Sequence, residues 1–169
     1  MLSAALAAFG VLGVMPGVSA APSRPEATLS GAPIDLSAGW GAAKGCVVWG
    51  QSGGVECFTS IAALKAAESH HQAAAGVPPP GTCSSYLDLF SGASFSGSEL
   101  DVYDDAVWLN LSTFGFADRT VSFINGACQS YLAKGVSGGV PWYSNSGPWV
   151  EISNMGLYWN DTIQSVYVS

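Results

Sequence analysis

The chain has 169 residues, 49% hydrophobic and only 10% charged, and this length suits one ordinary domain with a short extension. Twelve acidic residues outnumber five lysines and arginines, so the formal net charge is −7. This balance excludes a basic surface that could neutralise phosphates, so we expect neither nucleic acid nor an anionic membrane as a partner.

An apolar run fills residues 1–20, where Pro16 interrupts it and the small pair Ser19 and Ala20 ends it. This pattern predicts a secretory signal peptide that is cleaved after Ala20 or Ala21. A membrane anchor is the alternative, but the run is short and rich in glycine and alanine. No later stretch is long enough to span a membrane, so we expect a secreted protein.

Residues 21–45 are rich in alanine, proline, serine and glycine, with a single tryptophan, Trp40. Such a composition buries little apolar surface on its own. We therefore expect a flexible leader over 21–45.

Four cysteines agree with export: Cys46, Cys57, Cys83 and Cys128. An even count in a small exported domain implies two disulfides, for which three pairings are possible. We favour Cys46–Cys57, because these cysteines flank two short strands around a glycine-rich turn. We pair Cys83 with Cys128, whose separation is close to the period of the repeat described below. No histidine accompanies the cysteines, which argues against a structural zinc site.

A helix follows the hairpin, because "SIAALKAAESHHQAAA" is rich in strong helix formers and Thr59 or Ser60 can cap its start. Gly76 and three consecutive prolines end it. We therefore expect a hairpin–helix extension over 46–76 and a proline-rich linker over 77–82.

Residues 83–169 lack helical periodicity and carry many aromatic residues between closely spaced turn residues, so we predict that they are all-β. One pattern occurs twice, as "WLNLSTFGF" from Trp108 and as "WVEISNMGL" from Trp149, about forty residues apart. Two copies are too few for a propeller or a solenoid. They suit a closed β-sandwich in which each copy covers the apolar face of the other.

Short motifs in the two copies resemble the signature of the βγ-crystallin superfamily. The first copy contains "FSGASFSG" and the second "YLAKGVSG", and each closes on a stretch of the N/D-N/D-x-x-S/T-S type, "ADRTVS" and "NDTIQS". The residues that carry the resemblance are Phe90, Phe95, Gly97, Ser122, Tyr131, Gly138 and Ser165.

The resemblance implies an all-β fold, a double Greek-key βγ-crystallin-like sandwich over residues 84–168 within a domain spanning 83–169, preceded by a small β-hairpin plus helix. In that family the first aromatic residue, here Phe90, lies against a folded hairpin, here residues 91–97. The glycine, here Gly97, adopts a backbone conformation closed to residues with a Cβ. The preceding hairpin and helix resemble a segment of secreted bacterial proteins that are similar to γ-crystallin-fold proteinase inhibitors.

Calcium is the cofactor that the resemblance suggests, because crystallin-type domains bind Ca²⁺ through the closing stretch. The candidate ligands are Asp118, Asn160, Asp161 and Gln164. Both copies depart from the family pattern: Gln164 replaces a ligating hydroxyl, and Ala117 and Val121 replace polar residues. The alternative interpretation is that Asp118 and Asp161 cap turns by bonding nearby backbone N–H groups.

We find no pattern that indicates an enzyme. His70 and His71 are adjacent on a helix and point in different directions, so they cannot chelate one metal together. Asp104 and Asp105 share one acidic turn, where neighbouring carboxylates rarely converge on a substrate. No serine has a nucleophile-elbow pattern.

The leading functional hypothesis is therefore a secreted, monomeric, non-enzymatic binding protein of the peptidase-inhibitor type, acting on an extracellular protease or another secreted macromolecule. A rigid loop can block a protease because little entropy is lost on binding. The candidate loop contains Gly135, Pro141 and Trp142, although Trp142 could instead pack in the core. The alternatives are a calcium-binding or purely structural crystallin module and, more weakly, a small killer-toxin-like protein.

Overall fold

The computed structural model describes residues 26–50, 54–75, 85–103 and 106–169. The predicted signal peptide, the whole of the predicted linker and Cys83 lie outside these ranges. Within them, no helix has the length and apolarity that crossing a membrane requires.

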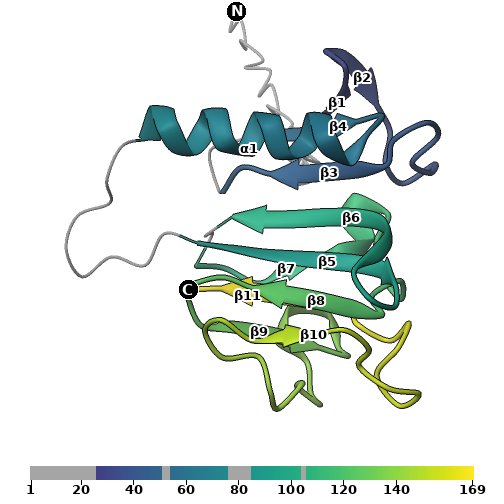
Figure 1. Cartoon of the computed structure of the whole chain (residues 1–169). Helices are drawn as coiled ribbons and strands as arrows, with labels where there is room; N and C mark the ends of the chain where they lie inside the picture. The colour runs from purple at the N-terminus through teal and green to yellow at the C-terminus, as the bar shows by residue number, and fades with distance from the viewer. Residues whose placement is uncertain (1–25, 51–53, 76–84, 104–105) are drawn as a thin grey trace, which may run out of the picture.

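The described chain contains one α-helix and eleven strands (Figure 1). The helix α1 spans Ile61–Ala75, and the hydroxyl of Ser60 caps it by accepting a hydrogen bond from the N–H of Ala63. The strands are β1 (Ala27–Leu29), β2 (Ala32–Ile34), β3 (Gly45–Val48), β4 (Val55–Phe58), β5 (Tyr86–Gly92), β6 (Ser96–Tyr103), β7 (Leu109–Asn110), β8 (Ser122–Asn125), β9 (Ser130–Ala133), β10 (Glu151–Ile152) and β11 (Ser165–Val168). Two short 3-10 helices, η1 (Leu111–Phe114) and η2 (Val136–Gly138), complete the set.

The strands form two sheets, and the two sequence copies share both of them. The larger sheet has the order β10-β8-β5-β6-β3-β4-β1-β2, and the smaller has the order β7-β11-β9. Strand β10 from the second copy therefore joins the sheet of the first copy, and β7 from the first copy joins the sheet of the second. This exchange explains why the aliphatic residues of both copies meet in one core.

The predicted all-β character of the C-terminal half is confirmed, since its described regular elements are strands and two short 3-10 helices. The finer description as a double Greek key stays a prediction.

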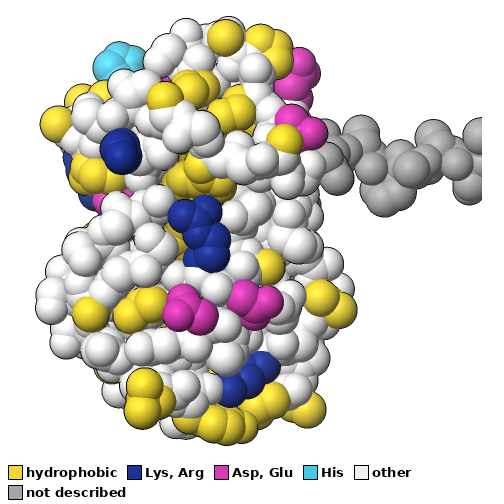
Figure 2. Space-filling view, turned by 90° about the vertical axis from the view of Figure 1, so that its right-hand side faces the viewer, with side chains coloured by type: hydrophobic (Ala, Val, Ile, Leu, Met, Phe, Trp, Pro, Cys, Tyr) yellow, Lys and Arg dark blue, Asp and Glu magenta, His cyan; other side chains and the backbone are white. Residues whose placement is uncertain are grey.

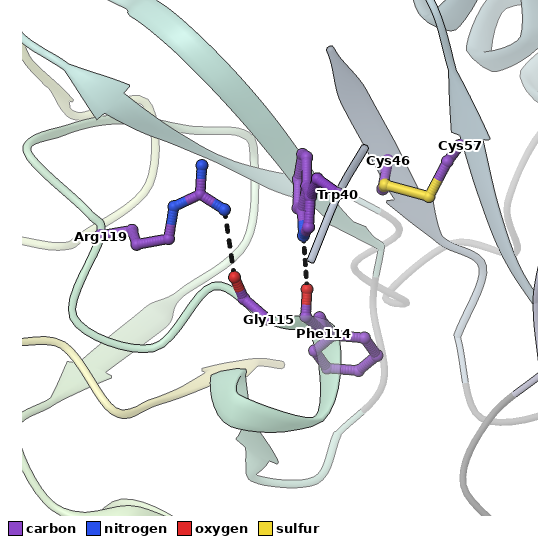
Figure 3. The surroundings of a disulfide bond; sticks show 6 residues. All are labelled: Trp40, Cys46, Cys57, Phe114, Gly115 and Arg119. Atoms are coloured by element: carbon purple, nitrogen blue, oxygen red, sulfur yellow. Dashed lines mark hydrogen bonds between the residues drawn. A yellow bond between two sulfur atoms is a disulfide. The ribbon is translucent and has the colours of Figure 1, made fainter. Parts of the chain in front are cut away.

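The N-terminal extension continues the larger sheet and is not a separate unit. Strand β3 pairs in parallel with β6, placing Cys46 beside Leu100, and pairs antiparallel with β4 on its other edge. Cys46 lies directly opposite Cys57 in that second pairing, and the two form a disulfide, as predicted (Figure 3). Cys128 is buried and is not a free thiol, but its predicted pairing with Cys83 involves a residue outside the described ranges.

The structure differs from the expectation of a flexible leader over 21–45. Residues 27–34 form the antiparallel pair β1–β2, and β1 adds to β4 at the edge of the larger sheet. Trp40 is buried, its ring centroid lies 5.2 Å from that of Phe116, and the guanidinium of Arg119 lies 5.1 Å above it (Figure 3). The leader has too few apolar residues to form a core of its own, but Trp40 and Leu36 complete the core of the C-terminal half.

The first folded hairpin lies between β5 and β6. The rings of Phe90 and Phe95 meet edge to face, with centroids 5.7 Å apart. Gly97 has φ = +89°, and a Cβ there would lie 2.5 Å from the hydroxyl of Ser91. Only a residue without a side chain fits this position without strain.

The second copy has an equivalent glycine, which meets a different partner. Gly138 has φ = +82°, and a Cβ there would lie 2.4 Å from the indole of Trp108. Tyr131 follows the first residue of β9, and its ring centroid lies 6.4 Å from that of Trp108. The indole thus fills the space that the missing side chain leaves open.

Ser122 and Ser165 tie each folded hairpin to the last strand of its copy. The hydroxyl of Ser122 donates to the carbonyl of Gly92 at 2.6 Å and accepts from the N–H of Phe95 at 3.1 Å. The hydroxyl of Ser165 donates to the carbonyl of Gly135 at 2.7 Å and accepts from the N–H of Gly138 at 3.0 Å. The two copies therefore repeat the same side-chain-to-backbone hydrogen bonds in three dimensions.

Candidate functional site

The candidate binding loop, residues 135–142, follows β9 and folds back on it, so that Trp142 forms an isolated antiparallel bridge with Ala133. Its most exposed apolar side chains are Val140, 80% exposed, Val136 and Trp142, which is 46% exposed. Gly135 lies at its base, and Pro141 follows a cis peptide bond. The structure therefore places Trp142 at the surface and not in the core.

Hydrogen bonds hold this loop at several points. The N–H of Lys134 donates to the carbonyl of Pro141 at 3.0 Å, and that of Gly135 donates to the carbonyl of Gly139 at 2.8 Å. The indole Nε1 of Trp142 donates to the carbonyl of Gly138 at 2.6 Å. These bonds limit the conformations that the loop can adopt.

An aromatic group lies beneath the loop, on the outer side of the smaller sheet. Tyr131 and Tyr167 are register partners in β9 and β11, with ring centroids 6.0 Å apart. The ring of Trp142 lies 5.5 Å from that of Tyr131 and 5.6 Å from that of Trp108. Figure 2 shows hydrophobic side chains gathered at the lower end of the molecule, opposite α1. Trp142 of the loop thus packs against half-buried rings that lie outside the loop.

The predicted calcium ligands lie in the two closing stretches, which exchange backbone hydrogen bonds. The N–H of Asp118 donates to the carbonyl of Ile163, and the N–H of Asp161 donates to the carbonyl of Thr120, both at 3.0 Å. Asp118 and Asp161 both have positive φ and are exposed. This reciprocal pairing brings the two stretches side by side.

Side-chain contacts within the stretches pair two of the predicted ligands with each other and a third with a neighbouring turn. The amide of Gln164 donates to a carboxylate oxygen of Asp118 at 2.5 Å. The amide of Asn160 donates to the side chain of Asn154 at 3.1 Å. Among the described residues, the acidic, histidine or cysteine side chains close enough to share an ion are Glu68, Asp88 and Asp101, none of which was a predicted ligand.

The sequence reasoning missed this acidic cluster, which lies between α1 and the larger sheet. The ammonium of Lys65 lies 3.0 Å from Glu68, 3.4 Å from Asp88, 2.7 Å from Glu99 and 3.0 Å from Asp101. All four acidic residues are at most 6% exposed. The alternation of Asp88, Glu99 and Asp101 with buried aliphatic residues places them on one face of β5 and β6, but it does not show that α1 covers this face.

Burial dominates the electrostatics of the cluster. It raises the pKa of Asp88 from 3.8 to about 7, although the attraction of Lys65 opposes the rise. Burial, followed by repulsion from Asp88, raises the pKa of Asp101 well above its usual range. Burial alone would lower the pKa of Lys65, but the attraction of Asp101, Asp88, Glu99 and Glu68 outweighs it and raises that pKa. The folded protein therefore favours retaining protons on this group at mildly acidic pH.

A surface pocket of about 330 Å³ lies elsewhere, between β2 and η1. Glu26, Asp35 and Thr113 contribute its polar side chains. The carboxylate of Asp35 accepts hydrogen bonds from both the N–H and the hydroxyl of Ser37 in its own turn. No predicted site residue lines this pocket.

No protein-family model matches the sequence, and a search of curated proteins finds no significant match.

The similar solved structures are βγ-crystallin domains. A βγ-crystallin from Ciona intestinalis is 20% identical with a TM-score of 0.43, over 50% of this chain and 99% of that one. A structure described under the evolution of the eye lens βγ-crystallin domain fold is 16% identical with a TM-score of 0.45, over 56% and 93%. A βγ-crystallin domain from Flavobacterium johnsoniae is 17% identical with a TM-score of 0.40, over 49% and 92%.

Proposed function

We propose that this chain is a secreted, monomeric, non-enzymatic binding protein of the crystallin-fold inhibitor type. It engages an extracellular protease or another secreted macromolecule through the loop 135–142, held on a double Greek-key scaffold. The observation that carries this proposal is the exposure of Val136, Val140 and Trp142 on a loop whose backbone is fixed by hydrogen bonds.

Exposed apolar side chains on a fixed loop favour binding for two reasons. Burying Val140 and Trp142 against a partner removes apolar surface from water, and tryptophan is a common anchor of protein interfaces. The loop is already ordered, so little conformational entropy is lost when it docks. A surface that served only solubility would place polar side chains at these positions.

Purified secreted metalloproteases and serine proteases, titrated with the full chain, test the proposal. We expect stoichiometric inhibition of at least one protease on a protein substrate. Val140→Asp should weaken inhibition at least tenfold, because a charge at the contact must lose its hydration on docking.

Trp149→Ala is the matched control. Trp149 is 72% exposed, but it precedes β10 in the other sheet, so its loss should leave inhibition unchanged. Melting curves show whether each variant remains folded. Absence of inhibition across both protease classes, or equal inhibition by the wild-type chain and Val140→Asp, would contradict the proposal.

A further inference from the structure

The acidic cluster combines more buried charge than its single lysine can balance. Four carboxylates from α1, β5 and β6 surround one ammonium, so the group carries a net negative charge when all its members are ionised. Asp88 and Asp101 are register partners in adjacent strands, where like charges repel directly. Buried charge of one sign is costly unless a further positive charge compensates it.

Lys65 engages only one oxygen of each of three carboxylates. It contacts Oε2 of Glu68, Oδ2 of Asp88 and Oδ2 of Asp101. The second oxygen of each group is buried and makes no hydrogen bond to any described residue: Oε1 of Glu68, Oδ1 of Asp88 and Oδ1 of Asp101. Three residues that are more than nine-tenths buried thus each keep an acceptor with no partner, although buried acceptors are nearly always satisfied.

The spacing of these three side chains fits one metal ion. One carboxylate oxygen from each of Glu68, Asp88 and Asp101 lies within 4.8 Å of the others. Two ligands on opposite sides of a calcium ion stand about 5 Å apart, because each Ca²⁺–oxygen distance is about 2.4 Å. Carboxylate oxygens select hard cations such as Ca²⁺, Mg²⁺ and Mn²⁺, whereas zinc and copper prefer nitrogen or sulfur.

We propose that Glu68, Asp88 and Asp101 bind one hard divalent cation between α1 and the larger sheet, beside the ammonium of Lys65. The ion bonds to one carboxylate oxygen of each residue, and it joins the helix to β5 and β6. This site is distinct from the crystallin closing stretches, and it does not depend on the loop 135–142 or on any protease partner.

Calorimetric titration and melting of the full chain test the proposal, after treatment with a chelator and its removal. The probes are CaCl₂, MgCl₂ and MnCl₂, each added alone. We expect binding of one ion per chain with at least one probe and a rise in melting temperature at saturation. A chain whose melting temperature and heat signal do not respond to any of the three ions at millimolar concentration overturns the proposal.

Asp101→Asn removes a ligand charge and relieves the repulsion from Asp88. We expect this variant to fold at least as well as the wild type without metal, and to lose at least tenfold in cation affinity. Glu68→Gln, at the edge of the cluster on α1, provides a second ligand variant if Asp101→Asn is poorly folded. Unchanged affinity in a folded ligand variant overturns the assignment.

Two further variants separate this site from its alternatives. Lys65→Met should raise cation affinity by about tenfold or more, because a positive charge a few ångströms away no longer repels the ion. The double variant Asp118→Asn with Asp161→Asn should leave the affinity unchanged. If that double variant alone abolishes binding, the ion belongs to the closing stretches and the proposal is wrong.

Discussion

The indole Nε1 of Trp40 donates a 2.7 Å hydrogen bond to the carbonyl oxygen of Phe114. These residues are far apart in sequence, and both are buried. The bond joins the segment before β3 to η1 in the C-terminal half, residues 85–169 (Figure 3). The N-terminal extension and the C-terminal half therefore share one core, and we expect them to unfold together.

Truncation of Trp40 should destabilise the whole molecule. We expect Trp40→Ala to lower the free energy of unfolding by about 3–5 kcal/mol, because it removes a buried aromatic side chain and leaves a cavity. Trp40→Phe keeps an aromatic ring but leaves the Phe114 carbonyl without its donor, at a cost of about 1–3 kcal/mol. Urea unfolding, followed by circular dichroism, measures both.

The exposed Trp149 provides the comparison, since Trp149→Ala should change the free energy of unfolding by less than about 0.5 kcal/mol. Equal effects at Trp40 and Trp149 would show that the N-terminal segment is not docked.

The two corner serines should contribute similar and separable amounts. Ser122→Ala and Ser165→Ala each remove a buried hydroxyl that bonds both a carbonyl and an N–H of a folded hairpin. We expect a loss of about 1–3 kcal/mol in the free energy of unfolding for each. Because the serines share no partner, the double variant should lose close to the sum.

Denaturant midpoints of the three corner variants and of Ser144→Ala, an exposed serine, measure these losses. A strongly non-additive double variant would contradict the interpretation that the two corners act independently.

The glycine of the first folded hairpin can be tested against a glycine with the same backbone but open space. Gly97 has φ = +89° and Gly156 has φ = +85°, but a Cβ at Gly156 would meet no atom within 4 Å. Gly156→Ala should therefore cost about 1–2 kcal/mol from backbone strain alone.

Gly97→Ala should cost more than Gly156→Ala, because its methyl group also collides with Ser91 and lies 3.2 Å from the backbone nitrogen of Gly92. Thermal melts of both variants give the comparison. A Gly156→Ala loss equal to or larger than that of Gly97→Ala would remove the steric argument for the hairpin signature.

The sequence could predict the features that depend on local pattern. Cys46 and Cys57 flank a short turn, so their pairing follows from the chain between them. Gly97 and Gly138 close the eight-residue motifs "FSGASFSG" and "YLAKGVSG", and this position in the motif led to the expectation of a positive φ. Trp40 was misassigned to a flexible leader because its partners, Phe114 and Phe116, lie far along the chain.

The acidic cluster was missed for the same physical reason. Lys65 and Glu68 lie on α1, Asp88 on β5, and Glu99 and Asp101 on β6. Each strand alone shows only a polar residue alternating with aliphatic ones, which is typical of an ordinary solvated face. The burial appears only when α1 packs beside β3 and brings Lys65 over β5 and β6, and no local pattern specifies this placement.

The raised carboxyl pKa values in this cluster predict how stability depends on pH when a chelator keeps metal ions away. The ordinary pKa of an aspartate is 3.8, and burial raises that of Asp88 to about 7 in the folded state. Between these values the folded chain holds more protons than the unfolded chain, so the free energy of unfolding falls as the pH rises. The slope is about 1.4 kcal/mol per pH unit for each extra proton held.

The raised pKa of Asp101 acts in the same direction, because burial and repulsion from Asp88 also favour its protonated form. Lys65 does not reverse this trend, since its raised pKa keeps it charged throughout the window. Tyr86 and Tyr103 face the same group, and burial raises both of their pKa values, so both stay neutral there. The contribution of Asp88 is largest below its ordinary pKa of 3.8, declines as the pH rises toward about 7, and levels off only above that value.

Urea unfolding at intervals from pH 4.5 to pH 8, in the presence of a chelator, measures this profile. Asp88→Asn should flatten it, because the amide keeps the shape of the carboxyl group but cannot titrate. In Lys65→Met, the free energy of unfolding should fall more steeply toward neutral pH than in the wild type. The reason is that no lysine then offsets the charge of the ionised carboxylates. Asp118→Asn, which changes an exposed carboxylate outside the cluster, should leave the slope as it is in the wild type. A wild-type free energy of unfolding that rises steadily from pH 5 to pH 7 would show that these carboxylates ionise at their ordinary pKa in the folded chain.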